Sequence, residues 1–400
     1  MEGRAADGRD PSGTATAFCR EVLAGRAPSR LPDGTAERTE VLGLLRLHRL
    51  LGLWVVERRG PDPGPSGADV RGPMVQQAFH AGLVLEAADR AMAALRAGGL
   101  EVLSFKGVGL VRCGVYVDPA ARALGDADLL VRGGPAGQAV QVLEAAGFEP
   151  WVPWDPGREA WLPAFSLSDA TAPDGVEVTV DLHWRIPYGS YRSGAEGDGA
   201  ELWADADREG GSLSPEAHAL LLAEHFVRHL RVVPHLIGLA DLVRLLPHVR
   251  DPARLRALAG TRRSTRPMRA VLGCVRDELG VDLDPDLAQV LEVPARRSRR
   301  EVRALRLGAM LQPAGGRREG RIEGLVGQAL LQGSPGDFLR ELARVVYPPA
   351  DWLARRAGPE TGGALRRRFG YWRDLIRWAL GRRGSPLSPN QEFEDPAGRS

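Results

Sequence analysis

Residues 101–131 constrain the fold most. They contain an apolar segment, then a loop, then the sequence Gly-Asp-Ala-Asp, which continues directly into a second apolar segment. Side chains of a strand alternate between its two faces, so Asp126 and Asp128 are expected to project together. Ala127 and Leu129 then face the core. Two adjacent carboxylates repel each other and are costly to bury without a cation. The pattern predicts either a divalent metal site, with Mg²⁺ as the preferred ion, or a solvated turn before a strand.

A second strand, expected over residues 176–184, carries a third carboxylate. Three valines alternate there with three polar residues, the last of which is Asp181, as is typical of a strand with one buried face. If this strand lies beside the first, Asp126, Asp128 and Asp181 converge, which is the usual provision for metal-assisted phosphoryl or nucleotidyl transfer. An ordinary exposed strand acid is the alternative for Asp181. His183 shares the face of Asp181 and is expected to contact phosphate, to orient Asp181, or to be a satisfied strand histidine.

Lys106 is the single lysine among the 53 lysine and arginine residues of the chain. Lysine offers a compact point charge, whereas arginine offers a wide planar fork. A tight turn with Gly107 beside a triphosphate would favour the smaller group. Chance survival of one lysine is the alternative interpretation.

Together these motifs resemble the uncharacterised nucleotidyltransferase family of bacteria, a branch of the DNA polymerase beta-like nucleotidyltransferase superfamily. The resemblance rests on a Lys-Gly turn at Lys106, on Arg122 shortly before the Asp-Ala-Asp strand, and on Val-Asp-Leu-His-Trp at residues 180–184. It extends over residues 40–355. Better-characterised members of the superfamily carry a Gly-Ser or Gly-Gly pair at the head of the site, where this chain has Lys-Gly-Val-Gly.

The resemblance implies a metal-dependent enzyme that moves a nucleoside monophosphate from an NTP to an unidentified acceptor and releases pyrophosphate. The implied metal ligands and catalytic residues are Asp126, Asp128 and Asp181, the last as a possible base. The implied substrate-binding residues are Lys106, Gly107, Arg122 and His183. Mg²⁺ is the expected cofactor, with Mn²⁺ as an alternative, and RNA, a protein or a small molecule is the expected acceptor.

Two other functions remain open at this stage. One is a catalytically inactive protein that binds a nucleotide or a partner on the same fold. The other is a tailoring enzyme for a peptide or metabolite in a biosynthetic operon. Arginine clusters at residues 262–266 and 296–300 would suit RNA phosphates or, alternatively, solvated helix faces. His225 and His229, one helical turn apart, lack a third zinc ligand, so a helix that lends a histidine to the nucleotide pocket is the preferred interpretation.

Strand, helix and strand in close order predict an α+β protein with a small mixed-sheet nucleotidyltransferase core. N-terminal helices and a C-terminal helical domain are expected around it, and one helix is expected over residues 38–59. The expected organisation is a disordered N-terminus (1–36), N-terminal helices (37–98), the catalytic core (99–190), a helical domain (212–383) and a disordered tail (384–400).

The charge and hydropathy of the chain exclude some partners. The formal net charge is only +2, so no global field attracts nucleic acid. The chain has no apolar run of about 18 residues, as a membrane-spanning helix would need. It also has no N-terminal signal peptide pattern, in which basic residues are followed by an apolar stretch. Three distant cysteines suit a reducing compartment. These features predict a cytoplasmic protein without stable membrane insertion.

Overall fold

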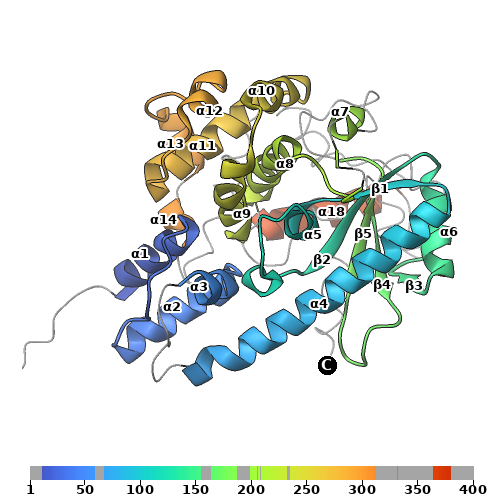
Figure 1. The fold of residues 1–400 in the computed structure, drawn as a ribbon, viewed down its shortest axis with the longest axis horizontal. Helices are drawn as coiled ribbons and strands as arrows, with labels where there is room; N and C mark the ends of the chain where they lie inside the picture. Colours follow the sequence, from blue (N-terminus) through green and yellow to red (C-terminus); the bar gives the residue numbers. More distant parts are fainter. Residues whose placement is uncertain are drawn as a thin grey trace, which may run out of the picture.

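The computed structural model describes residues 11–58, 67–154, 164–186, 199–204, 206–207, 209–231, 235–305, 307–311, 331 and 364–379. In these residues a mixed sheet is flanked by a long helix on one side and by a group of helices on the other (Figure 1). The predicted tail at residues 384–400 lies outside the described residues.

The sheet has five strands in the order β1-β2-β5-β4-β3. Their bounds are Glu101–Ser104 (β1), Asp126–Arg132 (β2), Phe148–Pro150 (β3), Ala164–Asp169 (β4) and Thr179–His183 (β5). β2 and β5 are parallel, and the other neighbouring strands are antiparallel. The prediction of an α+β protein with a small mixed sheet is therefore confirmed, and β5 lies at the centre of the sheet.

One face of the sheet is apolar and is covered by helices α4 (Gly67–Ala97) and α6 (Ala136–Ala145). Ala127, Leu129 and Val180 are buried in the core beneath these helices, as strand alternation requires. The opposite face carries the acidic side chains. It packs against α5 (Lys106–Arg112), which in turn contacts α8 (Pro215–Arg228).

The N-terminal part contains α1 (Pro11–Leu23), α2 (Thr35–Leu47) and α3 (Leu51–Glu57). The expectation of disorder over residues 1–36 is wrong for α1, because Phe18 packs edge-on against Trp54 with ring centroids 5.8 Å apart. The expectation of one helix over residues 38–59 is also wrong. Arg49, with φ of 60°, breaks it into α2 and α3.

Helices dominate the described residues after residue 199. They are α7 (Ala200–Trp203), α8, α9 (Ile237–Leu245), α10 (Pro252–Thr261), α11 (Thr265–Leu279), α12 (Pro285–Val290), α13 (Arg299–Ala304), α14 (Leu307–Met310) and α18 (Ala364–Ala379). α8 begins at Pro215, and the Ser214 hydroxyl caps it by accepting a 3.2 Å hydrogen bond from the Ala217 amide. The buried side chains of α8 and α9 join one core with those of α1 and α2.

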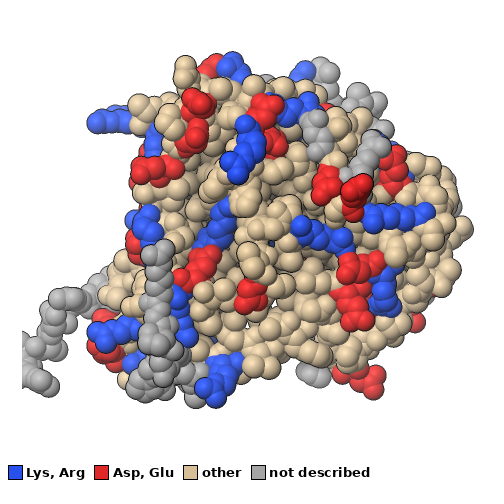
Figure 2. Space-filling model, viewed as in Figure 1, with Lys and Arg blue, Asp and Glu red and all other residues tan. Residues whose placement is uncertain are grey.

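Charges of both signs are interspersed on the face shown in Figure 2. In the predicted arginine clusters, Arg262 forms ion pairs with Glu201 and Glu224. Arg297 pairs with Glu278 in the same way. Both side chains therefore have structural partners. No helix in the described part of the chain is long and apolar enough to cross a bilayer.

Candidate functional site

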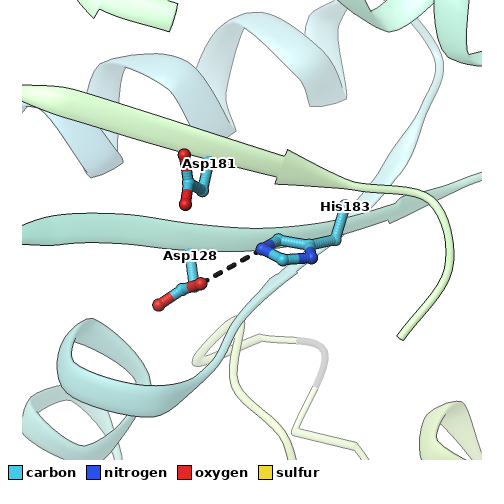
Figure 3. A group of neighbouring side chains, drawn as sticks. All are labelled: Asp128, Asp181 and His183. Carbon is cyan, nitrogen blue, oxygen red and sulfur yellow. Dashed lines mark hydrogen bonds and ion pairs between the residues drawn. The ribbon is translucent and has the colours of Figure 1, made fainter. Parts of the chain in front are cut away.

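Three potential metal ligands meet on the polar face of the two central strands. Because β2 and β5 are parallel and in register, Asp128 lies directly opposite Asp181, and His183 lies opposite Leu130. Figure 3 shows Asp128 and His183 pointing toward each other, with Asp181 on the neighbouring strand. One ligand atom from each of the three residues lies within 4.8 Å of the other two. The sequence predicts that the carboxylates converge only if the two acidic strands are neighbours. The structure shows that β2 and β5 are neighbours.

Asp126 precedes Asp128 by two residues, so it lies on the same face of β2, and it pairs with Thr179 of β5. Its side chain is half-buried. Burial, followed by repulsion from Asp128 and Asp181, raises the pKa of Asp126 to about 7. The three carboxylates therefore interact electrostatically, and the two neighbouring acids make the charged form of Asp126 less favourable.

Asp128 is the best-stabilised anion of the group. It is only 2% exposed, and its Oδ1 accepts hydrogen bonds from Lys106 Nζ at 2.5 Å and from His183 Nε2 at 3.1 Å. Burial alone would raise its pKa. The Lys106 ammonium and His183 outweigh burial and lower the pKa of Asp128 to about 2.

Backbone geometry brings Lys106 to this position. Lys106 opens α5 with φ of 50°, a left-handed conformation that is unusual for a residue with a side chain. The preceding Phe105 amide donates a 3.1 Å hydrogen bond to the Asp128 carbonyl, which ties the start of α5 to β2. The Phe105 ring also packs edge-on against His183, with centroids 4.9 Å apart. Phe105 thus fixes both partners of the Asp128 carboxylate.

Asp181 is oriented by the next strand. Ser166 of β4 lies opposite Asp181, and its Oγ donates a 2.6 Å hydrogen bond to Asp181 Oδ1. Ser166 lies outside the sequence motifs described above. Two features could have pointed to it. Ser166 alternates with the buried residues Phe165 and Leu167, which places it on the polar face of β4, and the register of the β4–β5 hairpin places it opposite Asp181.

Arg122 is placed beside α5 but is tied to a buried carboxylate. Its Nη2 donates to Asp241 Oδ2 at 2.9 Å and its Nε to Asp241 Oδ1 at 3.3 Å. Tyr116 donates to the same Oδ1 at 2.6 Å. A Cβ on Gly107 would lie 2.4 Å from Arg122 Nη1, so Gly107 makes room for this guanidinium. The predicted contacts of Arg122 and Gly107 with a triphosphate remain predictions.

α8 closes the site from the side of α5. A Cβ on Gly109 would lie 2.6 Å from His218 Nε2, so glycine is required for the close approach of the two helices. Burial, followed by the charge of His229, holds the pKa of His225 well below its usual range. Lys106 adds to this effect, so His225 lies within electrostatic range of the Lys106 ammonium. Neither His218 nor His225 belongs to the group of potential metal ligands found in the described residues.

The residues present fit a divalent cation. Carboxylate oxygens are the donors that Mg²⁺ and Mn²⁺ prefer, and the raised pKa of Asp126 follows from burial and from the negative charges of Asp128 and Asp181 beside it. The Lys106 ammonium stands where a counter-cation is needed, on Asp128 Oδ1. His183 is hydrogen-bonded to the same carboxylate, as residues that orient a metal ligand commonly are.

Comparison with known proteins identifies the family. A family model described as uncharacterised nucleotidyltransferase matches residues 36–280, which is more than half of the 400-residue chain. No curated protein and no solved structure matched the chain. The matched segment includes both acidic strands, Lys106 and the helices that carry His225 and Asp241. The chain therefore belongs to the uncharacterised nucleotidyltransferase family.

Proposed function

We propose that the protein is a metal-dependent nucleotidyltransferase. It transfers a nucleoside monophosphate from an NTP to an acceptor nucleophile. The observation that carries the proposal is the in-register pairing of Asp128 and Asp181 on parallel strands, with Asp126 on the same face. In the reaction a bond forms between the acceptor and the α-phosphorus. The bond between the α-phosphorus and the pyrophosphate oxygen breaks.

Asp126, Asp128 and Asp181 would hold the metal ion, Mg²⁺ or Mn²⁺. Such an ion would neutralise charge at the reacting phosphate and make the acceptor easier to deprotonate. Ser166 fixes Asp181 through Oδ1, so we assign the proton of the acceptor to Asp181 Oδ2. His183 and Ser166 each orient one carboxylate, which limits the motion that would weaken the site.

Lys106 serves the phosphates of the NTP in this scheme. In the metal-free protein its ammonium balances the charge of Asp128 at 2.5 Å. With that carboxylate engaged by a cation, the ammonium becomes available to phosphate oxygens. Lysine binds phosphate as a point charge, and the start of α5 directs the side chain toward the polar face of β2.

The test is transfer of label from each of the four α-labelled nucleoside triphosphates in the presence of Mg²⁺. Purified protein is incubated with separate RNA, protein and small-molecule fractions of a lysate. We expect label in one fraction, lost on addition of EDTA and lost in Asp128→Asn. Asp174→Asn is the matched control, because Asp174 is an exposed acid in the β4–β5 turn.

The outcomes separate the functions that the sequence left open. Label in the RNA, protein or small-molecule fraction identifies the acceptor class. Binding of Mg²⁺ and NTP without transfer to any fraction would favour a nucleotide-binding protein over an enzyme. Equal transfer by wild type and Asp128→Asn would overturn the assignment of the site.

A further inference from the structure

A second cation lies beside the residue that precedes the acidic strand β2, and it comes from outside the sequence motifs. The Arg49 Nη1 atom lies 2.8 Å, and its Cζ 3.5 Å, from the position that a Cβ on Gly125 would occupy. Gly125 directly precedes Asp126, the first residue of β2. The Arg49 guanidinium therefore rests against the backbone that leads into the acidic strand, in space left open by a glycine.

Arg49 also acts on the cluster through its charge. Burial and the two neighbouring carboxylates raise the pKa of Asp126, while Lys106 and Arg49 oppose that rise. Lys106 contacts Asp128, and Arg49 stands beside the residue before Asp126. Lys106 of α5 thus contacts one acid of β2, and Arg49, between α2 and α3, lies beside the residue that precedes the other acid.

The Arg49 side chain is available to a ligand, in contrast to that of Arg122. Within the described part of the chain, the Arg49 guanidinium forms no hydrogen bond or ion pair, and the side chain is exposed. Arg122 is buried and bound by both oxygens of Asp241. Arg49 can therefore form hydrogen bonds to a ligand without breaking any that it already makes, whereas Arg122 would have to give up its bonds to Asp241.

The backbone of Arg49 gives an independent indication. Its φ of 60° is left-handed, at the end of α2, where its amide donates to the Arg46 carbonyl at 3.0 Å. Glycine is the residue favoured at such a helix end. Residues held in this conformation occur often at ligand-binding sites. The same conformation recurs at Arg263, after α10, which provides a matched position for comparison.

We propose that Arg49 binds the phosphate groups of the triphosphate, in the role that the sequence assigned to Arg122. The inference rests on the proposed function of the site. An arginine fork can donate two parallel hydrogen bonds to one phosphate, which Lys106 cannot do. Lys106 and Arg49 then approach a bound triphosphate from two different elements.

The experiment measures the affinity of the protein for inorganic tripolyphosphate and for an NTP, with Mg²⁺ present, by isothermal titration calorimetry. Wild type is compared with Arg49→Gly, Arg49→Lys and Arg263→Gly. We expect Arg49→Gly to weaken both affinities by about tenfold or more, because a charge-assisted contact is lost. Arg49→Lys should lie between wild type and Arg49→Gly, and Arg263→Gly should bind as wild type does.

Stability separates this role from a structural one. Glycine relieves the left-handed backbone at either position, so neither Arg49→Gly nor Arg263→Gly should lower the melting temperature of the metal-free protein. Loss of affinity with unchanged or raised stability cannot come from unfolding. A fall in melting temperature of Arg49→Gly, without a fall for Arg263→Gly, would show a structural role and overturn the inference.

The remaining outcomes are also decisive. Equal tripolyphosphate affinity for wild type and Arg49→Gly overturns the role of Arg49 and leaves the proposed function standing. Wild-type binding that is lost in Arg49→Gly, but without nucleotidyl transfer to any acceptor fraction, supports Arg49 and counts against the enzyme. A wild-type protein that binds neither ligand overturns both.

Discussion

Ser166 of β4 lies directly opposite Asp181 of β5 and donates a 2.6 Å hydrogen bond to its Oδ1. If Asp181 is a metal ligand, removing this donor should loosen the carboxylate without removing it. Partners of this kind usually contribute a factor of about 10 to 100 in metal affinity or activity. We expect Ser166→Ala to lower the initial rate of transfer by that factor, with Mg²⁺ below saturation.

Ser168 supplies the control for Ser166. It lies two residues further along β4 on the same face, and its Oγ accepts a 2.6 Å hydrogen bond from Trp151 Nε1 instead. Ser168→Ala should therefore leave the transfer rate unchanged. Equal rates for Ser166→Ala and wild type across a Mg²⁺ titration would contradict the role of Ser166.

The buried Arg122–Asp241 pair predicts a large stability effect. Asp241 is fully buried and also accepts a hydrogen bond from Tyr116. Removal of one partner leaves a buried charge uncompensated, so Asp241→Ala should lower the free energy of unfolding by about 3–5 kcal/mol. Tyr116→Phe loses one hydrogen bond to a charged group and should cost about 1.5–3 kcal/mol. Urea denaturation measures both.

A double variant separates structure from substrate binding at Arg122. Arg122→Met combined with Asp241→Leu replaces the ion pair by apolar side chains and should be more stable than Asp241→Ala alone. If this folded variant binds tripolyphosphate as tightly as wild type, the predicted contact of Arg122 with the triphosphate is wrong. If the double variant is no more stable than Asp241→Ala, the buried charge does not explain the loss.

His218 predicts sensitivity to acid. It is fully buried against Gly109 of α5, and burial lowers its pKa from 6.5 to about 4. Between these pH values the unfolded chain binds a proton on His218 that the folded protein does not, so stability falls as pH drops from 6.5 toward 4. The loss amounts to about 3 kcal/mol. His218→Gln should flatten this dependence in urea denaturation.

The sequence predicted the parts of the site that depend on local periodicity. Side chains along β2 and β5 point alternately to the two faces of the sheet, so Asp128 and Asp181 lie on the polar face and their apolar neighbours lie in the core. The Pro-Asp-Gly sequence at residues 173–175 is typical of a tight turn, and it lies between the antiparallel strands β4 and β5.

The partners of the motif residues were not predictable in the same way. Arg122 and Asp241 are 119 residues apart, and nothing in their local sequences indicates that they meet. The break between α2 and α3 falls at Arg49 and not at a glycine, so the helical periodicity appeared continuous. The buried face of α1 was hidden by a composition rich in glycine and alanine. Long-range packing decides all three features.

Asp126 links metal binding to pH. In the metal-free protein burial and the neighbouring acids raise its pKa from 3.8 to about 7. Between these values the folded state holds a proton on Asp126 that the unfolded state lacks, so the contribution of this group to stability falls as pH rises toward 7. Asp126→Asn resembles the protonated form and should stabilise the metal-free protein above pH 7, by at most about 4 kcal/mol.

Mg²⁺ should reverse this effect in wild type, because the ion competes with the proton for Asp126. We expect the rise in melting temperature on addition of Mg²⁺ to be larger at pH 8 than at pH 6, and to be small at both values in Asp126→Asn. Asp174→Asn, altered at an exposed acid, should behave as wild type does. A Mg²⁺-induced shift that is independent of pH, or that persists in Asp126→Asn, would remove Asp126 from the metal site and leave Asp128 and Asp181 as its carboxylates.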